Sequence, residues 1–297
     1  MKSIYVNNIE YTMRKDPQHY GIKQILLNHL DLKNLGITRI EDIEGLDSLM
    51  ELESLDLLDN AITKISGLES LPNLKRLRVG NNVAKIEGLD TLTQLTHLTI
   101  RGNLTQIQNL DHLYDIVILD LSQNQISEIS NLTSLKKIGD LSVAGNNLSK
   151  ISGLESLTSL KRLDLCSNNI NKISGLDSLS NIFELKLAYN KITKIQGLGS
   201  LTKLHRLHLE GNKITEISGL GSLKNLAELY LSQNEITKVS SLQNLAKLEV
   251  LGLSDNLITD LTDFKFPSRN LYDIRLRGNP LPLNQIRKFR EYDTFNH

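Results

Sequence analysis

The stretch Leu160–Asn181, LKRLDLCSNNINKISGLDSLSN, decides the fold because the next stretch, IFELKLAYNKITKIQGLGSLTK, repeats its spacing position for position. Both copies read L-x-x-L-x-L-x-x-N-x-I-x-x-I-x-G-L-x-x-L, and Asn168 and Asn190 mark a period of 22 residues. A fixed period of this length is typical of a stacked solenoid, in which each repeat is one structural unit. The marker asparagine recurs along the chain at Asn60, Asn82, Asn103, Asn124, Asn146, Asn168, Asn190, Asn212, Asn234, Asn256 and Asn279.

The leucines of the repeat define one buried face of a short strand. Leu163 and Leu165 are two residues apart, so an extended strand turns both side chains to the same face. Arg162, Asp164 and Cys166 then point to the opposite face. A single strand cannot bury its apolar face alone, so the repeats are expected to stack in parallel and share one core.

The marker asparagine falls where the chain leaves the strand and turns. Its amide both donates and accepts hydrogen bonds, so a column of asparagines is expected to satisfy turn backbone groups that stacking buries. The steps from Asn82 to Asn103 and from Asn103 to Asn124 are 21 residues, one shorter than the period. The missing residue lies just after the asparagine. Downstream of the column, Ile170, Ile173, Leu176 and Leu179 recur every three residues, which favours a return path of tight turns or short 3₁₀ segments.

A second recurring position on the return path is occupied by residues that tolerate positive φ. Asn109 and Asn131 stand there in two repeats, and we expect a left-handed turn at this point. Ser241 and Asp263 break the rule, which predicts a different turn at those two places. In six repeats the position is glycine, at Gly67, Gly88, Gly153, Gly175, Gly197 and Gly219.

Composition limits the kinds of partner and compartment that we expect. Lys+Arg and Asp+Glu both number 34, a balance that argues against nucleic acid or an anionic membrane as the main partner. The single cysteine, Cys166, excludes an internal disulfide and fits a reducing compartment. The first residues, MKSIYVNNIEYTMRK, contain no apolar signal segment. We therefore expect a cytoplasmic monomer.

The two ends of the chain depart from the repeat and are predicted to cap it. Residues 1–29 combine a hairpin signal around Asn7-Asn8 with a helix start at Asp16-Pro17. Residues 280–297 follow the repeats and are predicted to form a helix over the C-terminal end of the core. The apolar face of that helix would be Leu283, Ile286, Phe289 and Tyr292. The solenoid itself would run over residues 30–279, continuous with both caps as one structural domain.

The N-x-I-T-x-I-x-G-L-x-x-L-x-x-L form of the repeat resembles the 22-residue class of leucine-rich repeats. Two members of this class that it resembles are the regulatory subunit of protein phosphatase 1 and the internalins. The resemblance covers about residues 30–279. It implies an α/β solenoid of about twelve repeats, with a right-handed, curved, parallel β-sheet on the concave face and 3₁₀ or turn segments on the convex face. It also implies that proteins bind to the concave face.

Outward strand positions offer two groups of candidate partner-binding residues. Arg76, Arg78, His97 and Arg101 form a basic group that only Asp56 opposes in the adjacent rows. A second group combines rings with charge, at Lys186, Tyr189, His208 and Tyr230. Tyr and Arg are enriched among the residues that anchor protein interfaces, so both groups are candidates.

Other charged residues on the strands and turns have a simpler interpretation. From Asp140 through Arg162, Glu184 and Arg206 to Glu228, the charges alternate in sign along one row of adjacent strands. Such a ladder neutralises itself, and each exposed pair contributes only about 0.2–1 kcal/mol. The lysines that follow the asparagines, Lys150, Lys172 and Lys194, line one outer edge and are expected to serve solubility.

The sequence contains no convergent catalytic or metal-binding set. His205 and His208 are three apart in a strand and face opposite ways, so they cannot chelate one ion together. Asp164 lies two residues from Cys166 on the same face and disfavours its thiolate. We therefore expect no catalytic residues, no metal and no cofactor. The leading hypothesis is a non-enzymatic scaffold or regulatory subunit that binds a protein on its concave face. The alternative is an internalin-like cell-surface adhesin whose signal and anchor are absent from this chain.

Overall fold

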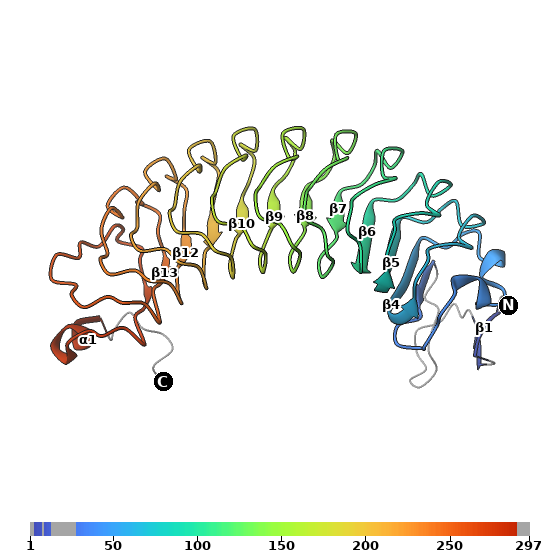
Figure 1. Cartoon of the computed structure of the whole chain (residues 1–297), viewed down its shortest axis with the longest axis horizontal. Coiled ribbons are helices and arrows are strands. Elements are labelled where there is room, and N and C mark those ends of the chain that lie inside the picture. Colours follow the sequence, from blue (N-terminus) through green and yellow to red (C-terminus); the bar gives the residue numbers. More distant parts are fainter. Residues whose placement is uncertain (1–2, 8, 13–27, 290–297) are drawn as a thin grey trace. The chain divides into compact units, whose positions relative to one another are not determined.

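The computed structural model describes residues 3–7, 9–12 and 28–289. The chain divides into two compact units, Met1–Val143 and Ala144–His297. Within the described residues, no helix combines the length and apolar character needed to span a membrane. In each unit the strands lie along one side and the turns along the opposite side (Figure 1).

Twelve strands of the described residues belong to the repeats, and they run in parallel in chain order. The first unit contains β3 (His29–Asp31), β4 (Ser54–Ile62), β5 (Arg76–Val83), β6 (His97–Gly102), β7 (Ile118–Asp120) and β8 (Asp140–Ser142). The second contains β9 (Arg162–Asp164), β10 (Glu184–Lys186), β11 (Arg206–His208), β12 (Glu228–Tyr230), β13 (Val250–Gly252) and β14 (Asp273–Arg275). The predicted parallel-strand solenoid is confirmed.

The pairing register places equivalent repeat positions side by side. Leu185 of β10 lies opposite Leu163 of β9 and Leu207 of β11. All three leucines are buried, so each strand contributes its inward side chain to a continuous column. Burying one such side chain contributes about 1.5–3 kcal/mol, and this contribution recurs at every repeat. The stacked leucine columns are therefore the core of each unit.

The return path consists of single tight turns rather than continuous 3₁₀ helix. The amide of Leu160 donates to the carbonyl of Leu157, and the amide of Leu157 donates to that of Leu154. These three-residue steps match the apolar spacing and bury each leucine. In the described residues, 3₁₀ helices occur only in the first repeat, as η1 (Ile40–Asp42) and η2 (Leu46–Ser48).

Most marker asparagines are buried and join neighbouring repeats. The side-chain oxygen of Asn190 accepts a hydrogen bond from the Ile170 amide at 3.0 Å, and its amide nitrogen donates to the Leu165 carbonyl at 2.9 Å. The same nitrogen also lies 3.1 Å from the Leu187 carbonyl of its own repeat. Equivalent bonds to the preceding repeat are made by Asn60, Asn124, Asn212, Asn234, Asn256 and Asn279.

Asn82 and Asn103 differ from this column, because both side chains are exposed. Each begins a 21-residue step. Their strands run on to Val83 in β5 and Gly102 in β6, as β4, whose Asn60 belongs to the column, runs on to Ile62. The assignment of these two asparagines to the structural column is therefore corrected.

The second turn position has positive φ wherever glycine or asparagine was expected to give it. A Cβ on Gly175 would lie only 2.6 Å from the Ile151 carbonyl oxygen of the preceding repeat. Asn131 meets the equivalent constraint differently, because its side-chain nitrogen donates to the Ile107 carbonyl at 2.7 Å. The prediction of a different turn at Ser241 is wrong, because Ser241 has a positive φ of 63°, like the glycines and asparagines at this position. Asp263 is absent from the described residues that have positive φ, as expected.

A further left-handed position, which the sequence pattern did not predict, directly precedes the buried asparagine. It is occupied by non-glycine residues in several repeats, including Ser167 (φ 55°), Tyr189 (φ 56°) and Gln233 (φ 59°). Glycine at Gly145, Gly211 and Gly278 was the available signal. This turn reverses the chain immediately after the strand, and it aims Tyr189 away from the strand itself.

The N-terminal hairpin is present and packs on the first repeat. Strand β1 (Ser3–Val6) pairs antiparallel with β2 (Ile9–Thr12). The amide of Tyr5 donates to the Glu44 carbonyl, and the Glu44 amide donates back to the Tyr5 carbonyl. Ile4 and Val6 are buried. The helix predicted from Asp16-Pro17 lies outside the described residues.

The C-terminal helix α1 (Leu283–Phe289) lies at the end of the repeats (Figure 1), and its last residue, Phe289, is buried. The Phe289 ring lies 5.6 Å from that of Phe264 and 5.9 Å from that of Phe266. Leu283 is 74% exposed, so its assignment to the buried face is wrong. Residues six apart on a helix are rotated by about 120° from one another, which carries Leu283 away from the core. Tyr292 lies outside the described residues.

We predict that Asn190→Ala destabilises the chain by about 1–3 kcal/mol, because it leaves the buried Ile170 amide without its hydrogen-bond acceptor. The matched control is Asn82→Ala, whose side chain is exposed and which should change stability by less than about 0.5 kcal/mol. The measurement is urea unfolding of both variants. Equal urea midpoints for the two variants would show that water supplies the hydrogen bonds assigned to the asparagine column.

We predict that Phe289→Ala lowers stability by up to about 3–5 kcal/mol, since it empties the aromatic cluster that joins α1 to the last repeat. Leu283→Ala removes a larger exposed area but no packed side chain, and it should be nearly neutral. Thermal melts of the two variants measure both stability changes. A larger loss in the Leu283 variant would contradict this assignment of the buried helix face.

Candidate functional site

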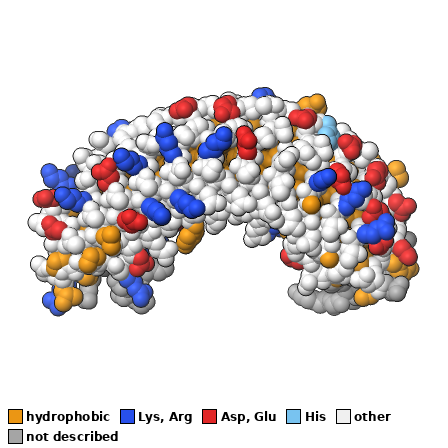
Figure 2. Space-filling view, in the orientation of Figure 1, with side chains coloured by type: hydrophobic (Ala, Val, Ile, Leu, Met, Phe, Trp, Pro, Cys, Tyr) orange, Lys and Arg blue, Asp and Glu red, His pale blue; other side chains and the backbone are white. Residues whose placement is uncertain are grey.

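The strand face is the surface formed by strand side chains that point away from the leucine core. It carries an arginine cluster in the first unit (Arg76, Arg78, His97 and Arg101) and an aromatic cluster in the second. The aromatic cluster comprises Lys186, His208 and Tyr230, together with Glu184, Arg206, Glu228 and Arg275. Figure 2 shows basic and acidic side chains interspersed over the visible side of each unit.

The arginine cluster is more fully paired than its sequence indicated. Arg78 donates to the buried carboxylate of Asp56 at 2.6 Å, and Arg101 lies 3.1 Å from Asp120 on the next strand. The sequence analysis missed Asp120 because it sits diagonally, two positions earlier in its strand. Arg76 is exposed, and no described acidic residue lies within ion-pair distance of it. Two of the three arginines are therefore committed to internal ion pairs.

His97 lies beside Arg76 in the sheet register, and its pKa is lowered. Burial lowers the pKa of His97, the Arg76 charge lowers it further, and Asp140 opposes both effects. Its ring nitrogen Nδ1 lies 2.8 Å from the Thr96 hydroxyl. A neutral, hydrogen-bonded His97 adds no positive charge to the cluster.

The aromatic cluster is organised around Tyr230. The His208 ring stacks on the Tyr230 ring with centroids 4.6 Å apart, and Arg275 lies 5.7 Å from the Tyr230 centroid. The Tyr230 hydroxyl donates to Glu228 at 2.9 Å. Burial and this hydrogen bond raise the pKa of Tyr230 to about 12. The ring is thus fixed in one orientation with its edges at the surface.

Charges around the rings are balanced by a ladder of neighbouring strands. Arg206 Nε donates to Glu228 at 2.9 Å, and this bond raises the pKa of Arg206. Burial raises the pKa of Glu228, but the hydrogen bonds from Arg206 and Tyr230 outweigh it, so the pKa falls below its usual value. The Arg162–Glu184 pair is looser, at 3.9 Å. The ladder predicted for this row is therefore present in the second unit.

His208 and Lys186 share the carboxylate of Glu184. Each of their nitrogens lies 3.7 Å from Glu184 Oε1, and His208 Nδ1 lies 3.4 Å from Glu210. Within the described ranges, no group of three His, Cys, Asp or Glu side chains is arranged to hold a metal ion. The arrangement fixes the position of His208 between two carboxylates and suits recognition of a polar surface.

Tyr189 was predicted on the strand face but lies beyond it. It occupies the left-handed turn after β10 and is 58% exposed. Its ring covers Gly211 of the next repeat so closely that a Cβ there would lie 2.5 Å from Tyr189 Cδ1. A side chain at position 211 would therefore displace the Tyr189 ring, which lies at the edge of the sheet.

A second ring pair escaped the sequence analysis. Phe183 and His205 precede β10 and β11, and their rings stack with centroids 4.9 Å apart. Arg206 lies 5.6 Å from the Phe183 centroid. The signal was present, because the two residues occupy the same repeat position and the register makes them neighbours.

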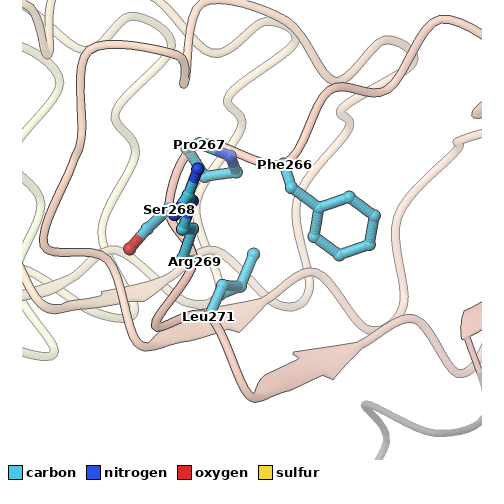
Figure 3. A pocket seen from close by; sticks show the side chains of 5 residues that line it. All are labelled: Phe266, Pro267, Ser268, Arg269 and Leu271. Atoms are coloured by element: carbon cyan, nitrogen blue, oxygen red, sulfur yellow. The ribbon is translucent and has the colours of Figure 1, made fainter.

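The second unit also has a hollow of about 370 Å³ near its C-terminal end (Figure 3). It is lined by Phe266, Pro267, Ser268, Arg269 and Leu271, and it lies beside the packed Phe289 ring. Its lining brings no set of convergent polar groups together. We assign it no function.

The family model that matches the chain is described as Leucine Rich repeats (2 copies), and it matches residues 51–91, 180–222 and 224–266. These residues include β4, β5, β10, β11, β12 and β13. The chain is a leucine-rich repeat protein.

Solved structures similar to this leucine-rich repeat protein include two internalins from Listeria monocytogenes. InlF is 29% identical with a TM-score of 0.76, over 87% of this chain and 76% of InlF. Internalin C2 is 32% identical with a TM-score of 0.58, over 64% of this chain and 84% of the internalin. No curated protein matches the chain. The resemblance to the phosphatase subunit stays a prediction.

A more distant similarity involves Toll in the Toll–Spätzle complex of Drosophila. The identity is 20% and the TM-score 0.61, over 83% of this chain and 40% of the other. At this identity the likeness concerns the fold alone.

The lone cysteine of this leucine-rich repeat protein is chemically protected. Cys166 is partly buried beside Asp164, whose carboxylate accepts the Cys166 backbone amide at 3.0 Å. Burial, and then the Asp164 charge, raise the pKa of the Cys166 thiol to about 12. The thiolate, which is the reactive form, is thereby suppressed at neutral pH.

At pH 8, we predict that Cys166 reacts with iodoacetamide about three orders of magnitude more slowly in the folded chain than in the unfolded chain, which is roughly the ratio of the two thiolate fractions. The sign follows from the raised pKa, because the thiolate forms only as pH approaches about 12. Asp164→Asn should recover part of the rate. Equal rates in folded and unfolded chains would contradict the assignment.

Proposed function

We propose that this leucine-rich repeat protein is a non-enzymatic scaffold that binds a protein partner through the aromatic cluster of its second unit. The fold supports a role in protein–protein interaction. The finer assignment is supported by the stacked His208–Tyr230 pair, in which the Tyr230 hydroxyl donates to Glu228 and the Tyr230 ring contacts Arg275. Rings fixed before binding lose little conformational entropy when a partner covers them.

The structure changes the order of preference between the two clusters. Arg78 and Arg101 already use their guanidinium groups on Asp56 and Asp120, so a partner carboxylate would have to replace an existing pair. The Tyr230 ring forms no ion pair of its own, so a partner that contacts the ring has no ion pair of Tyr230 to replace. Interface anchors are enriched in Tyr, Trp and Arg that pack centrally, which describes Tyr230 better than the paired arginines.

The similarity to internalins supports the alternative of a surface adhesin. Both hypotheses use the strand face, and they differ in compartment. We propose the cytoplasmic monomer as the working case. Fractionation of cells that express the native gene distinguishes it from the adhesin.

We predict that Tyr230→Ala and His208→Ala each weaken partner binding by about 1–2 kcal/mol, a typical cost for a central anchor. The partner is first captured with the intact chain, identified, and then titrated against each variant. Tyr114→Ala is the matched control, because this tyrosine is 63% exposed and lies on a turn. Tyr230→Phe, which keeps the ring, should retain most of the affinity.

Two outcomes would overturn this proposal. Full affinity in Tyr230→Ala combined with loss in Arg76→Ala would move the site to the arginine cluster. Equal loss in Tyr114→Ala would show that the effect is not specific to the strand face. Melting temperatures of all variants establish that they are folded.

A further inference from the structure

The guanidinium group of Arg206 is held in place while its terminal edge stays unused. Its Nε donates to Glu228 at 2.9 Å, and its central carbon lies 5.6 Å from the centroid of the Phe183 ring. A cation within about 6 Å of an aromatic ring is attracted to it, so two contacts orient this side chain. Neither Nη group of Arg206 has a hydrogen-bond partner among the described residues, and 39% of the side chain is exposed.

Other arginines of the strand face use the groups that Arg206 leaves unused. Arg78 and Arg101 each donate to a carboxylate through a terminal Nη. Arg275 donates through both Nε and Nη2. The paired Nη1 and Nη2 groups have the geometry that takes both oxygens of one carboxylate. A carboxylate can therefore bind end-on to Arg206 without displacing Glu228.

The charges on either side of Arg206 select the kind of anion that fits there. In the sheet register Arg206 lies between Glu184 of β10 and Glu228 of β12. Neighbouring strands lie about 4.8 Å apart, so a run of phosphates or of consecutive acidic side chains would bring negative charge over one of the two glutamates. A single carboxylate with uncharged atoms on both sides avoids this repulsion. The alternation therefore favours an isolated acidic side chain of a protein over nucleic acid or an anionic lipid surface.

Rings beside Arg206 offer contacts to the uncharged part of the same partner segment. Phe183 is 40% exposed, and its ring stacks on His205 with centroids 4.9 Å apart. On the other side, the Tyr230 hydroxyl donates to Glu228, the same glutamate that holds Arg206. Apolar contacts around a bound ion pair exclude water from it, which strengthens the pair. The free edge of Arg206 thus adjoins ring surface on both sides.

We propose that Arg206 anchors the partner by binding the carboxylate of an isolated Asp or Glu side chain through Nη1 and Nη2, with an uncharged neighbour of that side chain against Phe183. This inference rests on the proposed function, because it names the chemistry of the partner of the aromatic cluster. The sequence placed Arg206 only in the self-neutralising ladder. Its bond to Glu228 runs through Nε, however, and this leaves the terminal edge to the partner.

The test begins with a displayed library of random peptides, selected on the full chain and counter-selected on the Arg206→Gln variant. Peptides enriched by the intact chain are expected to carry one Asp or Glu with uncharged neighbours. One such peptide is synthesised and titrated. Arg206→Gln should weaken its binding about tenfold, the effect of losing charge-assisted hydrogen bonds. Changing the acidic residue of the peptide to its amide should have the same effect, and both changes together should cost no more than either alone.

Two further variants separate the terminal edge of Arg206 from charge alone. Arg206→Lys keeps the charge but lacks the paired N–H groups, so it should weaken peptide binding nearly as much as Arg206→Gln. The matched control is Arg76→Gln, which removes an exposed arginine from the same repeat position in the first unit and should change the affinity by less than about twofold. Melting temperatures of all variants establish that they are folded.

Several results would overturn the proposal. They are a library in which the intact chain enriches no acidic peptides over Arg206→Gln, equal losses in Arg76→Gln and Arg206→Gln, and additive losses when the chain and peptide changes are combined. Oligothymidylate is titrated in parallel and should bind equally to the intact and Arg206→Gln chains. Tighter binding of oligothymidylate than of the peptide, lost in Arg206→Gln, would assign the edge to nucleic acid instead.

The same peptide titrated against Tyr230→Ala tests the proposed function separately. Loss in Tyr230→Ala without loss in Arg206→Gln would keep the aromatic cluster as a binding site and overturn only the carboxylate assignment. Loss in Arg206→Gln without loss in Tyr230→Ala would support the carboxylate assignment and count against the ring pair. Loss in both variants is the expected result.

Discussion

One buried asparagine amide per repeat sets the geometry on which the rest of each unit depends. In Asn190 the side-chain oxygen accepts from Ile170 while the nitrogen donates to Leu165, so one amide bridges two repeats at two points. Leaving either group unsatisfied in the interior costs about 1–3 kcal/mol, which strongly favours a single register. Asn82 and Asn103, which begin 21-residue steps, are exposed and lie outside this column.

Fixed register turns a sequence period into columns of like positions, and those columns produce the surface chemistry. His208 reaches Tyr230 and Phe183 reaches His205 because each pair shares a repeat position across neighbouring strands. The same rule aligns Arg206 with Glu228 and stacks the turns that hold Lys191 and Lys213. Ladder charges cancel within the strand face, where Arg206 pairs with Glu228.

Sequence reasoning reached the repeat, the strand positions and most of the asparagine column, because those features depend on spacing and on burial of apolar side chains. The sequence-based predictions were wrong where the backbone conformation of one residue differed from what its place in the repeat indicated. Ser241 adopts the left-handed turn without being Gly or Asn, and Tyr189 is carried off its strand by such a turn. Diagonal contacts, such as Arg101 with Asp120, depend on side-chain reach rather than on row membership. Spacing alone therefore overestimated how much free positive charge the arginine cluster offers.

The central claim is that the asparagine side chains, and not water, accept the hydrogen bonds donated by the turn amides of the preceding repeat. Native-state hydrogen exchange of the full chain, read residue by residue by NMR, tests it most directly. The account predicts that the Ile170, Ile192 and Ile214 amides exchange as slowly as the strand-flanking amides of Leu187 and Leu209, which donate to backbone carbonyls. Exchange of the isoleucine amides as fast as exposed turn amides, with the leucine amides still protected, would contradict it.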